Sequence, residues 1–322
     1  MKPLLEVNNL CIDYLTADTS VRAVNNVSFT IGEGEVFGLA GESGCGKSTV
    51  AYGVTRLHQP PAIISSGSIK FAGEEVLDMN KDRLQKYRWG DVSMVFQSAM
   101  NALNPVLRVE KQFRDTLMAH KVVRNKKEAQ ARTAELLDLV GISPSRMFDY
   151  PHQFSGGMRQ RIVIAIALAL KPKLIVMDEP TTALDVVVQR EILQQIHELQ
   201  KKLGFSILFI THDLSLMVEF SNRIGIMYAG ELVEVAPSTE ILSVPKHPYT
   251  EGLGRAFPAI HGEKTPLIGI PGTPLDLSNV PNGCRFAARC EYANDKCKAN
   301  VPELIEVQSH LARCHYPLEA KA

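Results

Sequence analysis

The sequence lacks an excess of charge of either sign. Its 322 residues include 35 lysines and arginines and 35 aspartates and glutamates, which gives a formal net charge of +0. Electrostatic capture of nucleic acid needs a strong cationic field, and this composition does not supply one. We therefore expect no nucleic-acid partner.

Long hydrophobic runs are also missing. The longest is IVIAIALAL at residues 162–170, and these nine residues are too few for a membrane-spanning helix, which needs about 20. The first residues, MKPLLEVNNL, contain neither the apolar core nor the cleavage site of a secretory signal. These absences predict a soluble or peripheral protein of the cytosol, where cysteine clusters usually bind metal rather than form disulfides.

Short apolar runs alternate with a helical pattern along much of the chain. A helix is expected at 186–203 from the spacing of its apolar residues. Buried strands are expected at 35–40, 173–178 and 206–211. Strands that alternate with helices pair in parallel and are covered on both faces, so this order predicts an α/β fold built on a parallel sheet.

Other segments depart from that alternation. A helix is expected at 128–142, where Gly141 is suited to the C-terminal cap. Prolines become frequent after about residue 240, which argues against regular secondary structure there. Strand or hairpin patterns, with glycines marking the turns, occur at 4–8, 27–31, 66–78 and 223–236.

A glycine-rich loop, GESGCGKST at 41–49, lies between a predicted strand and a predicted helix. It matches the phosphate-binding pattern G-x-x-x-x-G-K-[ST]. The glycines let backbone N–H groups turn towards phosphate oxygens, Lys47 adds a positive charge, and Ser48 offers a hydroxyl to Mg²⁺. Cys45 is interpreted as a small spacer rather than a nucleophile. The expected ATP-binding residues of the loop are Gly41, Ser43, Gly44, Cys45, Gly46, Lys47, Ser48 and Thr49.

The predicted strand LIVMDE, 174–179, ends in two carboxylates. Asp178 is suited to hold Mg²⁺, directly or through water. Glu179, one residue further, is suited to polarise the water that attacks the terminal phosphate. Together with the upstream loop, this acidic pair predicts hydrolysis of ATP.

The stretch FSGGMRQR at 154–161 resembles the signature motif of the ABC transporter ATPase family. Ser155, Gly156 and Gly157 match the motif, whereas Met158 stands where the family usually has glutamine. A serine and two glycines at a helix start form an anion site. The resemblance implies that these three residues bind the γ-phosphate of ATP held by the other subunit.

Further motifs of this family follow in the matching order. The resemblance implies that Gln97, in VFQ, senses Mg²⁺ and the attacking water and touches a membrane partner. It implies that Asp185, in ALD at 183–185, links the two active sites of a dimer, and that His212, in ITHD, contacts the γ-phosphate. Tyr14 matches the aromatic residue that stacks on adenine, although a partly buried strand residue is the alternative.

The C-terminal part resembles one branch of the family. HPYT at 247–250, PG-x-P at 271–274 and the cysteine spacing C-x₅-C-x₆-C-x₁₆-C look like the oligopeptide/dipeptide importer ATPases. Some members of that branch hold a [4Fe–4S] cluster on these cysteines. In this sequence the four cysteines are Cys284, Cys290, Cys297 and Cys314.

Spacing alone does not identify what these cysteines hold. Four thiolates suit a [4Fe–4S] cluster or a structural Zn²⁺ site, and free thiols or disulfides are a third possibility. The resemblance favours the [4Fe–4S] cluster, with Zn²⁺ as the alternative. Arg285, Arg289 and Arg313 lie beside the cysteines in sequence and are expected to offset thiolate charge.

The resemblance implies three parts: an ABC nucleotide-binding domain at 1–240, a helical subdomain within it at about 98–168, and a C-terminal extension at 241–322. The expected fold class is α/β. It comprises a P-loop NTPase core with a parallel sheet, an antiparallel β subdomain, a helical subdomain and an irregular, cysteine-containing extension. The implied function is ATP hydrolysis coupled to uptake of di- or oligopeptides.

The resemblance also implies partners and a location. The partners are a second ABC ATPase subunit in a heterodimer, two transmembrane permease subunits and, indirectly, an extracytoplasmic solute-binding protein. The chain would then lie on the cytoplasmic face of the inner membrane as a peripheral protein. The solute stays open, because this branch also includes importers of oligosaccharides, nickel and other solutes.

Two other classes fit less well: a soluble ABC ATPase that acts on DNA, ribosomes or cluster assembly, and a non-hydrolysing regulatory subunit. A cluster-assembly ATPase would normally lack the proline-rich cysteine tail. A DNA-structural ABC ATPase would insert a long coiled coil between Lys47 and Ser155, but only 107 residues without heptads lie there. A translation-type ATPase would carry two cassettes, and this chain carries one. A non-hydrolysing regulatory subunit would be expected to lack Glu179 or His212, and both are present.

Overall fold

The computed structural model describes residues 2–16, 19–97, 102–182, 184–256 and 269–319. These residues divide into two compact units. Unit 1 is formed by the described residues of Met1–Lys2, Gly32–Glu35 and Asp78–Phe209. Unit 2 is formed by the described residues of Pro3–Ile31, Val36–Leu77 and Ile210–Ala322.

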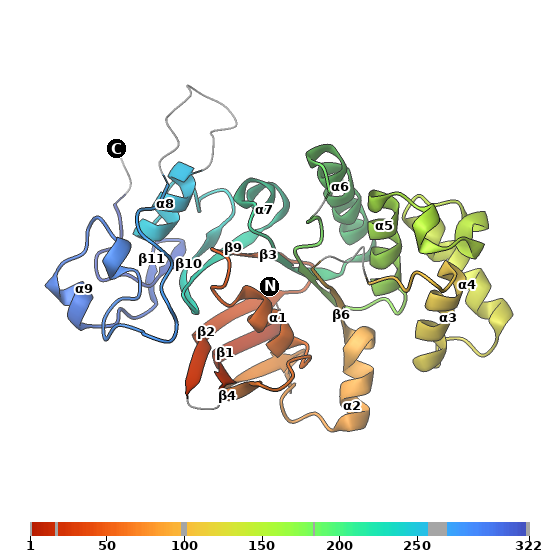
Figure 1. Ribbon diagram of the computed structural model, residues 1–322, viewed down its shortest axis with the longest axis horizontal. Helices are drawn as coiled ribbons and strands as arrows, with labels where there is room; N and C mark the ends of the chain where they lie inside the picture. Colours follow the sequence, from red (N-terminus) through yellow and green to blue (C-terminus); the bar gives the residue numbers. More distant parts are fainter. Residues whose placement is uncertain (1, 17–18, 98–101, 183, 257–268, 320–322) are drawn as a thin grey trace. The chain divides into compact units, whose positions relative to one another are not determined.

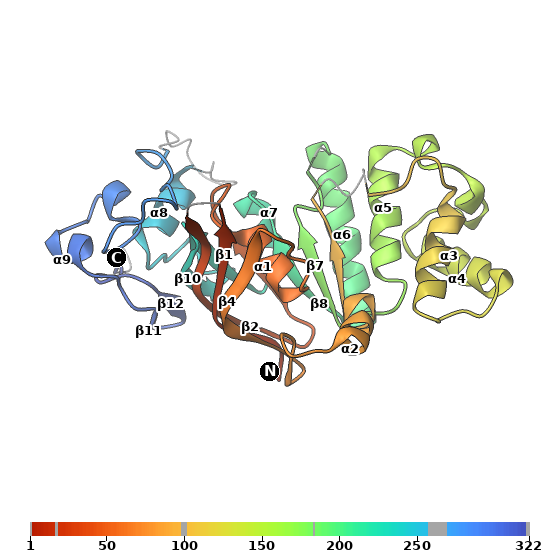
Figure 2. The ribbon, with the colours of Figure 1, turned by 60° about the horizontal axis from the view of Figure 1, so that its bottom comes forward.

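Unit 2 contains an antiparallel sheet with the strand order β2-β1-β4-β5. Strand β1 pairs antiparallel with β4, and the register shifts between Asn8 and Ile12. Leu5 and Val7 are fully buried before the shift, as are Leu10 and Ile12 at it, while the residues Leu10–Asp13 next to the shift are all buried and do not alternate. Figure 2 shows these strands in red and orange, and they confirm the expected antiparallel part. The bounds are β1 Pro3–Leu15, β2 Ser20–Gly32, β4 Ala62–Phe71 and β5 Glu74–Glu75.

Unit 2 also contributes the strand neighbours β11-β12-β10-β9-β3. Strands β3 and β9 run parallel, whereas β9 and β10 form the predicted hairpin around Ala229 and Gly230. The pairs β10–β12 and β11–β12 are also antiparallel, so the sheet expected to be parallel is mixed: the predicted hairpin and the two short strands join it at this end. The bounds are β3 Val36–Ala40, β9 Arg223–Tyr228, β10 Glu231–Pro237, β11 Ile305–Val307 and β12 His310–Ala312.

The helices of unit 2 correct one prediction. Residues after 240 were expected to lack regular structure, yet α8 is a nine-residue helix that begins at Pro248. Proline is tolerated in the first turn of a helix, where its missing N–H has no intrahelical partner, so here it starts a helix rather than breaking one. The bounds are α1 Lys47–Val54, α7 Leu214–Phe220, α8 Pro248–Ala256, the short turn η5 Ala287–Arg289 and α9 Asp295–Ala299.

Unit 1 contains strands β6 (Val92–Val95), β7 (Leu174–Asp178) and β8 (Ser206–Ile210). Strands β6 and β7 pair in parallel, and all five residues of β7 are buried. Helix α6 spans Val186–Leu203, as predicted. Its buried side chains, among them Ile192, Ile196 and Leu199, recur at helical spacing on one face, and the left-handed Gly204 ends the helix.

The helical part of unit 1 agrees with the expectation of helices within 98–168. Asn125 caps α4 by accepting a 3.0 Å hydrogen bond from the Glu128 backbone, and the left-handed Gly141 follows the helix, as predicted. Figure 1 shows α3, α4 and α5 together in yellow and green. Residues 98–101 of the expected region lie outside the described residues. The bounds are α2 Lys81–Lys86, η1 Tyr87–Asp91, α3 Val109–Ala119, α4 Lys126–Leu139, η3 Pro144–Phe148, η4 Pro151–Gln153 and α5 Gly156–Ala167.

The structure was also searched for membrane spans. Within the residues that it describes, no helix is both long enough and apolar enough to cross a bilayer.

Candidate functional site

The phosphate-binding loop in unit 2 follows β3 and depends on its glycines. Gly41, Gly44 and Gly46 have positive φ values of 148°, 78° and 103°. A Cβ at Gly41 would lie 2.2 Å from the Met227 carbonyl oxygen, and one at Gly46 would lie 2.5 Å from the Ala23 carbonyl oxygen. Side chains at these positions would therefore displace the backbone on which a phosphate site depends.

Lys47 turns back into the loop from the first position of α1. Its Nζ donates hydrogen bonds of 2.8 Å to the Gly41 carbonyl and 2.9 Å to the Glu42 carbonyl, and the residue is 6 % exposed. The Cys45 sulfur lies 3.7 Å from the same nitrogen. Burial raises the pKa of the Cys45 thiol, which favours the neutral form and agrees with its interpretation as a spacer.

Tyr14 lies near the end of β1 and is brought to the start of α1. Its hydroxyl is 3.4 Å from the Thr49 hydroxyl, and its side chain is half-buried. The structure thus groups Tyr14 with the loop residues, while stacking on adenine stays a prediction. Ser48 is half-buried beside Thr49, and Ser43 is exposed on the loop.

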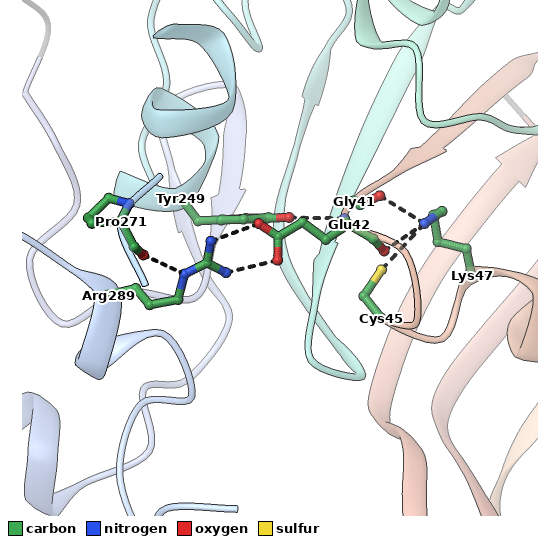
Figure 3. Close-up of polar contacts among 7 residues, drawn as sticks. All are labelled: Gly41, Glu42, Cys45, Lys47, Tyr249, Pro271 and Arg289. Carbon is green, nitrogen blue, oxygen red and sulfur yellow. Dashed lines mark hydrogen bonds and ion pairs between the residues drawn. The ribbon is translucent and has the colours of Figure 1, made fainter. Parts of the chain in front are cut away.

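Two side chains from the C-terminal part of unit 2 hold the same loop, and sequence reasoning did not find them. The Glu42 backbone N–H donates a 3.0 Å hydrogen bond to the Tyr249 hydroxyl. The Arg289 guanidinium donates to both carboxylate oxygens of Glu42, at 2.8 and 2.9 Å (Figure 3). Tyr249 lies in HPYT and Arg289 lies next to Cys290, but neither pattern indicates a partner in the loop.

The acidic end of β7 lies in unit 1. Asp178 is 2 % exposed, and the next residue, Glu179, has a left-handed φ of 48°. The Glu179 Oε2 accepts hydrogen bonds from Gln97 Nε2 at 2.9 Å and from Thr182 Oγ1 at 3.1 Å. Sparsely populated backbone conformations cluster at active sites, where the surroundings hold a functional group in place. The structure therefore brings together Gln97 and Glu179, two of the three residues expected to be catalytic.

The signature segment starts α5 in the same unit. Ser155 caps the helix, because its Oγ accepts a 3.3 Å hydrogen bond from the Met158 backbone. A Cβ at Gly157 would lie 2.8 Å from Val188 Cγ1 on α6, so this glycine permits close helix packing. Ser155 is exposed and Gly156 is half-buried, which leaves the helix start accessible. Their role towards ATP on another subunit stays a prediction.

The remaining two motif residues lie at the starts of helices in different units. Asp185 caps α6 in unit 1 by accepting a 3.0 Å hydrogen bond from the Val188 backbone. Ala183 of the same motif lies outside the described residues. His212 in unit 2 is exposed between β8 and α7, next to Asp213, which caps α7. Both positions suit contacts with a ligand or a second chain, and both roles stay predictions.

The four C-terminal cysteines of unit 2 share one neighbourhood. All four are free thiols; Cys297 is buried and the others are half-buried. The Cys284 backbone N–H donates a 2.8 Å hydrogen bond to the Cys297 carbonyl. Burial, and then the neighbouring thiols, raise the pKa of Cys284 to about 11 and that of Cys314 to about 11. The same causes raise the pKa of Cys290.

The thiols do not form a ligand set in this arrangement. Among the described residues, no group of three or more histidine, cysteine, aspartate or glutamate side chains is placed to hold a metal ion. Neither the [4Fe–4S] prediction nor the Zn²⁺ alternative is confirmed.

The three arginines beside the cysteines have partners elsewhere. Arg285 forms a 3.2 Å ion pair with the buried Glu231. Arg313 donates a 3.1 Å hydrogen bond to the Leu232 carbonyl. Arg289 pairs with Glu42, as described above. Their contacts join the cysteine-containing part to β10 and to the phosphate-binding loop.

Comparison with protein families gives three matches. A family model described as "ABC transporter" matches residues 24–182. A model described as "Oligopeptide/dipeptide transporter, C-terminal region" matches residues 233–297, which include HPYT and three of the four cysteines. A third model, "AAA domain, putative AbiEii toxin, Type IV TA system", matches residues 148–219.

Curated relatives match along nearly the whole chain. The dipeptide transport ATP-binding protein DppD of Lactococcus lactis subsp. cremoris is 44% identical over 96% of this chain and 90% of its own length. The oligopeptide transport ATP-binding protein AppD of Bacillus subtilis is 44% identical over 98% of this chain and 97% of its own. A putative peptide import ATP-binding protein of Brucella melitensis is 42% identical over 97% and 94%.

A solved structure supports the fold. The ATP-binding cassette MJ0796, in a dimeric post-hydrolysis state bound to ADP and Pi, superposes with a TM-score of 0.64 and 28% identity. The match covers 73% of this chain and 98% of that one. The chain therefore has the ABC ATPase fold, and its identity to the curated relatives shows that it belongs to the ATP-hydrolysing ABC transporter ATP-binding proteins.

Proposed function

We propose that this chain hydrolyses ATP to drive uptake of di- or oligopeptides across a membrane. The observation that carries the choice of solute is the match of residues 233–297 to the C-terminal region of oligopeptide/dipeptide transporters. That match lies beside a complete set of ATPase motif residues. The named solutes of the full-length relatives point the same way.

The chemical roles follow from the residue types and their surroundings. Lys47 neutralises the β- and γ-phosphates, and Tyr14 stacks on the adenine. Ser48, Asp178 and Gln97 hold Mg²⁺, and Glu179 polarises the attacking water. His212 contacts the γ-phosphate. The hydrogen bond between Gln97 and Glu179, at 2.9 Å, supports the assignment of these two side chains to the same water and metal.

Assembly completes the site in this proposal. The exposed helix start at Ser155, with Gly156 and Gly157, binds ATP held by a second ABC ATPase subunit in a heterodimer, and Asp185 couples the two sites. The region after Gln97 docks two transmembrane permease subunits, which receive solute from an extracytoplasmic binding protein. The chain then lies on the cytoplasmic face of the inner membrane.

We also propose a domain organisation for the chain. Residues 1–240 form the nucleotide-binding domain, with the helical subdomain at about 98–168. Residues 241–322 form an extension whose four cysteines hold a [4Fe–4S] cluster, with Zn²⁺ as the alternative. The shared neighbourhood of the four thiols supports this assignment. Metal binding would reverse the raised pKa values of Cys284, Cys290 and Cys314, because the metal stabilises thiolates.

The metal proposal is tested by elemental analysis of anaerobically purified protein. About four irons per chain and a brown colour support the cluster. One zinc in colourless protein supports the alternative. Four titratable thiols with neither metal would refute both.

The transport proposal is tested in proteoliposomes that contain the chain with its partner ATPase, permeases and binding protein. We expect ATP-dependent uptake of labelled di- or oligopeptides, and loss of that uptake with Glu179→Gln. The matched control is Glu191→Gln, because this glutamate on α6 has a 59% exposed side chain. Uptake of an oligosaccharide or Ni²⁺ in place of peptides would overturn the solute. Full ATPase activity without permeases and without any uptake would overturn transport.

A further inference from the structure

The phosphate-binding loop contains a carboxylate that its proposed ligand should repel. Glu42 follows the first glycine of the loop, and its backbone carbonyl accepts a 2.9 Å hydrogen bond from Lys47 Nζ. ATP brings several negative charges to this loop. An uncompensated carboxylate here would oppose binding, because like charges a few ångström apart repel strongly where solvent screening is weak. This inference rests on the ATP-binding function proposed above.

Arg289 meets this carboxylate with both terminal nitrogens of its guanidinium. The two hydrogen bonds are 2.8 and 2.9 Å long, and the exposed fractions are 6% for the Arg289 side chain and 23% for that of Glu42. The remaining nitrogen, Nε, donates a 2.8 Å hydrogen bond to the Pro271 carbonyl (Figure 3). A bidentate pair in this geometry fixes both position and charge. The hydrogen bond to Glu42 is the main cause that raises the pKa of Arg289.

Packed aromatic side chains also hold Glu42 and the segment that carries Arg289. The buried Tyr249 accepts the Glu42 N–H, and its ring lies 4.8 Å from that of Tyr228 and 5.3 Å from that of Phe286. Phe286 belongs to the same short segment as Arg289, and the Arg289 guanidinium lies 5.6 Å from the centre of the Tyr228 ring. The segment Cys284–Cys290 is thereby packed against the partners of the loop. A local displacement of the segment would move Arg289 away from Glu42.

We propose that Arg289 is a positioning residue for ATP binding. It cancels the charge of Glu42 and holds the loop backbone, so that ATP affinity depends on the folded state of the segment Cys284–Cys290. If the pair of Arg289 and Glu42 were only structural, Arg289 would be buried in the same way, but ATP affinity would not depend on the charge at position 42. The dependence of ATP affinity on that charge therefore distinguishes a positioning role from a purely structural one.

The test measures affinity of the full-length chain for a fluorescent ATP analogue, with thermal unfolding as a check of folding. We expect Arg289→Ala to weaken binding by about tenfold or more, because the carboxylate on the loop then adds an uncompensated negative charge near the phosphates. Glu42→Gln in the Arg289→Ala background should recover most of that loss. Arg289→Lys should lie between, since it keeps the charge but loses the bidentate geometry.

A single substitution at Glu42 gives a result of opposite sign. Glu42→Gln removes the negative charge and leaves Arg289 positive, so ATP should bind at least as tightly as to the unchanged chain. This variant keeps the proposal testable if Arg289→Ala does not fold. The control is Lys298→Ala, because Lys298 is a cation of the same C-terminal part whose side chain is 69% exposed and whose ion partner is Asp295, at 3.9 Å. It should leave affinity unchanged.

Two results would overturn the proposal. One is a double variant that binds ATP as weakly as Arg289→Ala, and the other is weaker binding by Glu42→Gln alone. Failure of the ATP-binding function itself looks different. In that case the unchanged chain would bind no better than Lys47→Ala.

Discussion

The phosphate-binding loop and the acidic end of β7 both follow buried strands, but they are held in different ways. Glu179 is held by Gln97, 82 positions away, and by Thr182, three positions away, both within the motif-containing part of the chain. Glu42 is held by Tyr249 and Arg289, which lie 207 and 247 positions further on. The Glu179 carboxylate is therefore supported by residues of its own motif region, whereas the phosphate-binding loop is supported by residues from the distant C-terminal part.

The two regions also differ in how they meet solvent. Lys47 is 6 % exposed and donates hydrogen bonds to loop carbonyls. Gln97, which is hydrogen-bonded to Glu179, is exposed to solvent. On the proposed ATP-binding function, a phosphate at the loop would compete with the existing hydrogen bonds of Lys47, whereas the bond between Gln97 and Glu179 at the end of β7 is exposed. Perturbations should act on affinity at the loop and on the chemical step at β7.

The largest effect is expected for Glu179→Gln. The amide keeps the shape of the side chain but loses the charge that polarises water, so the hydrolysis rate of the assembled importer should fall by about 10²–10⁴-fold. Affinity for ATP should change little. The measurement is a comparison of kcat with KM, with Glu191→Gln as the control. A normal kcat would remove Glu179 from catalysis.

Lys47→Ala should act at the phosphate-binding loop, the other of the two regions compared. Charged hydrogen bonds to phosphate contribute about 1.5–3 kcal/mol, so ATP affinity should fall by about 10- to 150-fold. Titration with a fluorescent ATP analogue measures this directly. Lys70→Ala, at an exposed position on β4, should not change affinity. Equal ATP affinity of the unchanged chain, Lys47→Ala and Lys70→Ala would count against the assignment of residues 41–49 as the phosphate-binding loop.

The stability of the C-terminal part that contacts the phosphate-binding loop should depend on pH through His247. Burial lowers the pKa of His247 to about 3, against a hydrogen bond to the Arg313 backbone that raises it, and the charge of Arg313 lowers it slightly further. The unfolded chain then binds more protons between pH 3 and 6.5, so stability falls as pH drops below 6.5, by up to about 1.4 kcal/mol per unit. His247→Asn should flatten this dependence in denaturant unfolding at pH 7, 6 and 5.

The control for this measurement is His152→Asn, at an exposed position. It should leave the pH dependence as it is in the unchanged chain. An unaltered slope in His247→Asn would show that His247 does not titrate with unfolding.

The smallest effect is expected at the start of α5, where the helix is capped by the nearby Ser155. Ser155→Ala removes the cap of α5 and should lower the free energy of unfolding by about 0.5–1 kcal/mol. Ser155→Asn keeps a capping oxygen and should restore most of that stability. Denaturant titration measures both. A loss in the asparagine variant as large as in the alanine variant would mean that the cap is not the cause.

Much of this architecture was predictable because its signals are local. The α6 boundaries, the hairpin at Ala229–Gly230 and the glycine loop follow from periodicity and backbone conformation within a few residues. The support of the loop was not predictable, because Arg289 gains its role only from a fold that returns it to Glu42. The helix at Pro248 was missed because proline was taken as a breaker rather than as a first-turn residue.

The pairing of Glu42 with Arg289 also has an evolutionary consequence. An acidic residue at this loop position is tolerable only while a cation reaches it from the C-terminal extension, so the two positions should be inherited together. Relatives that have lost the extension should carry a neutral or basic residue at the loop position. In lineages that keep both, a change at one position should be followed by a change at the other.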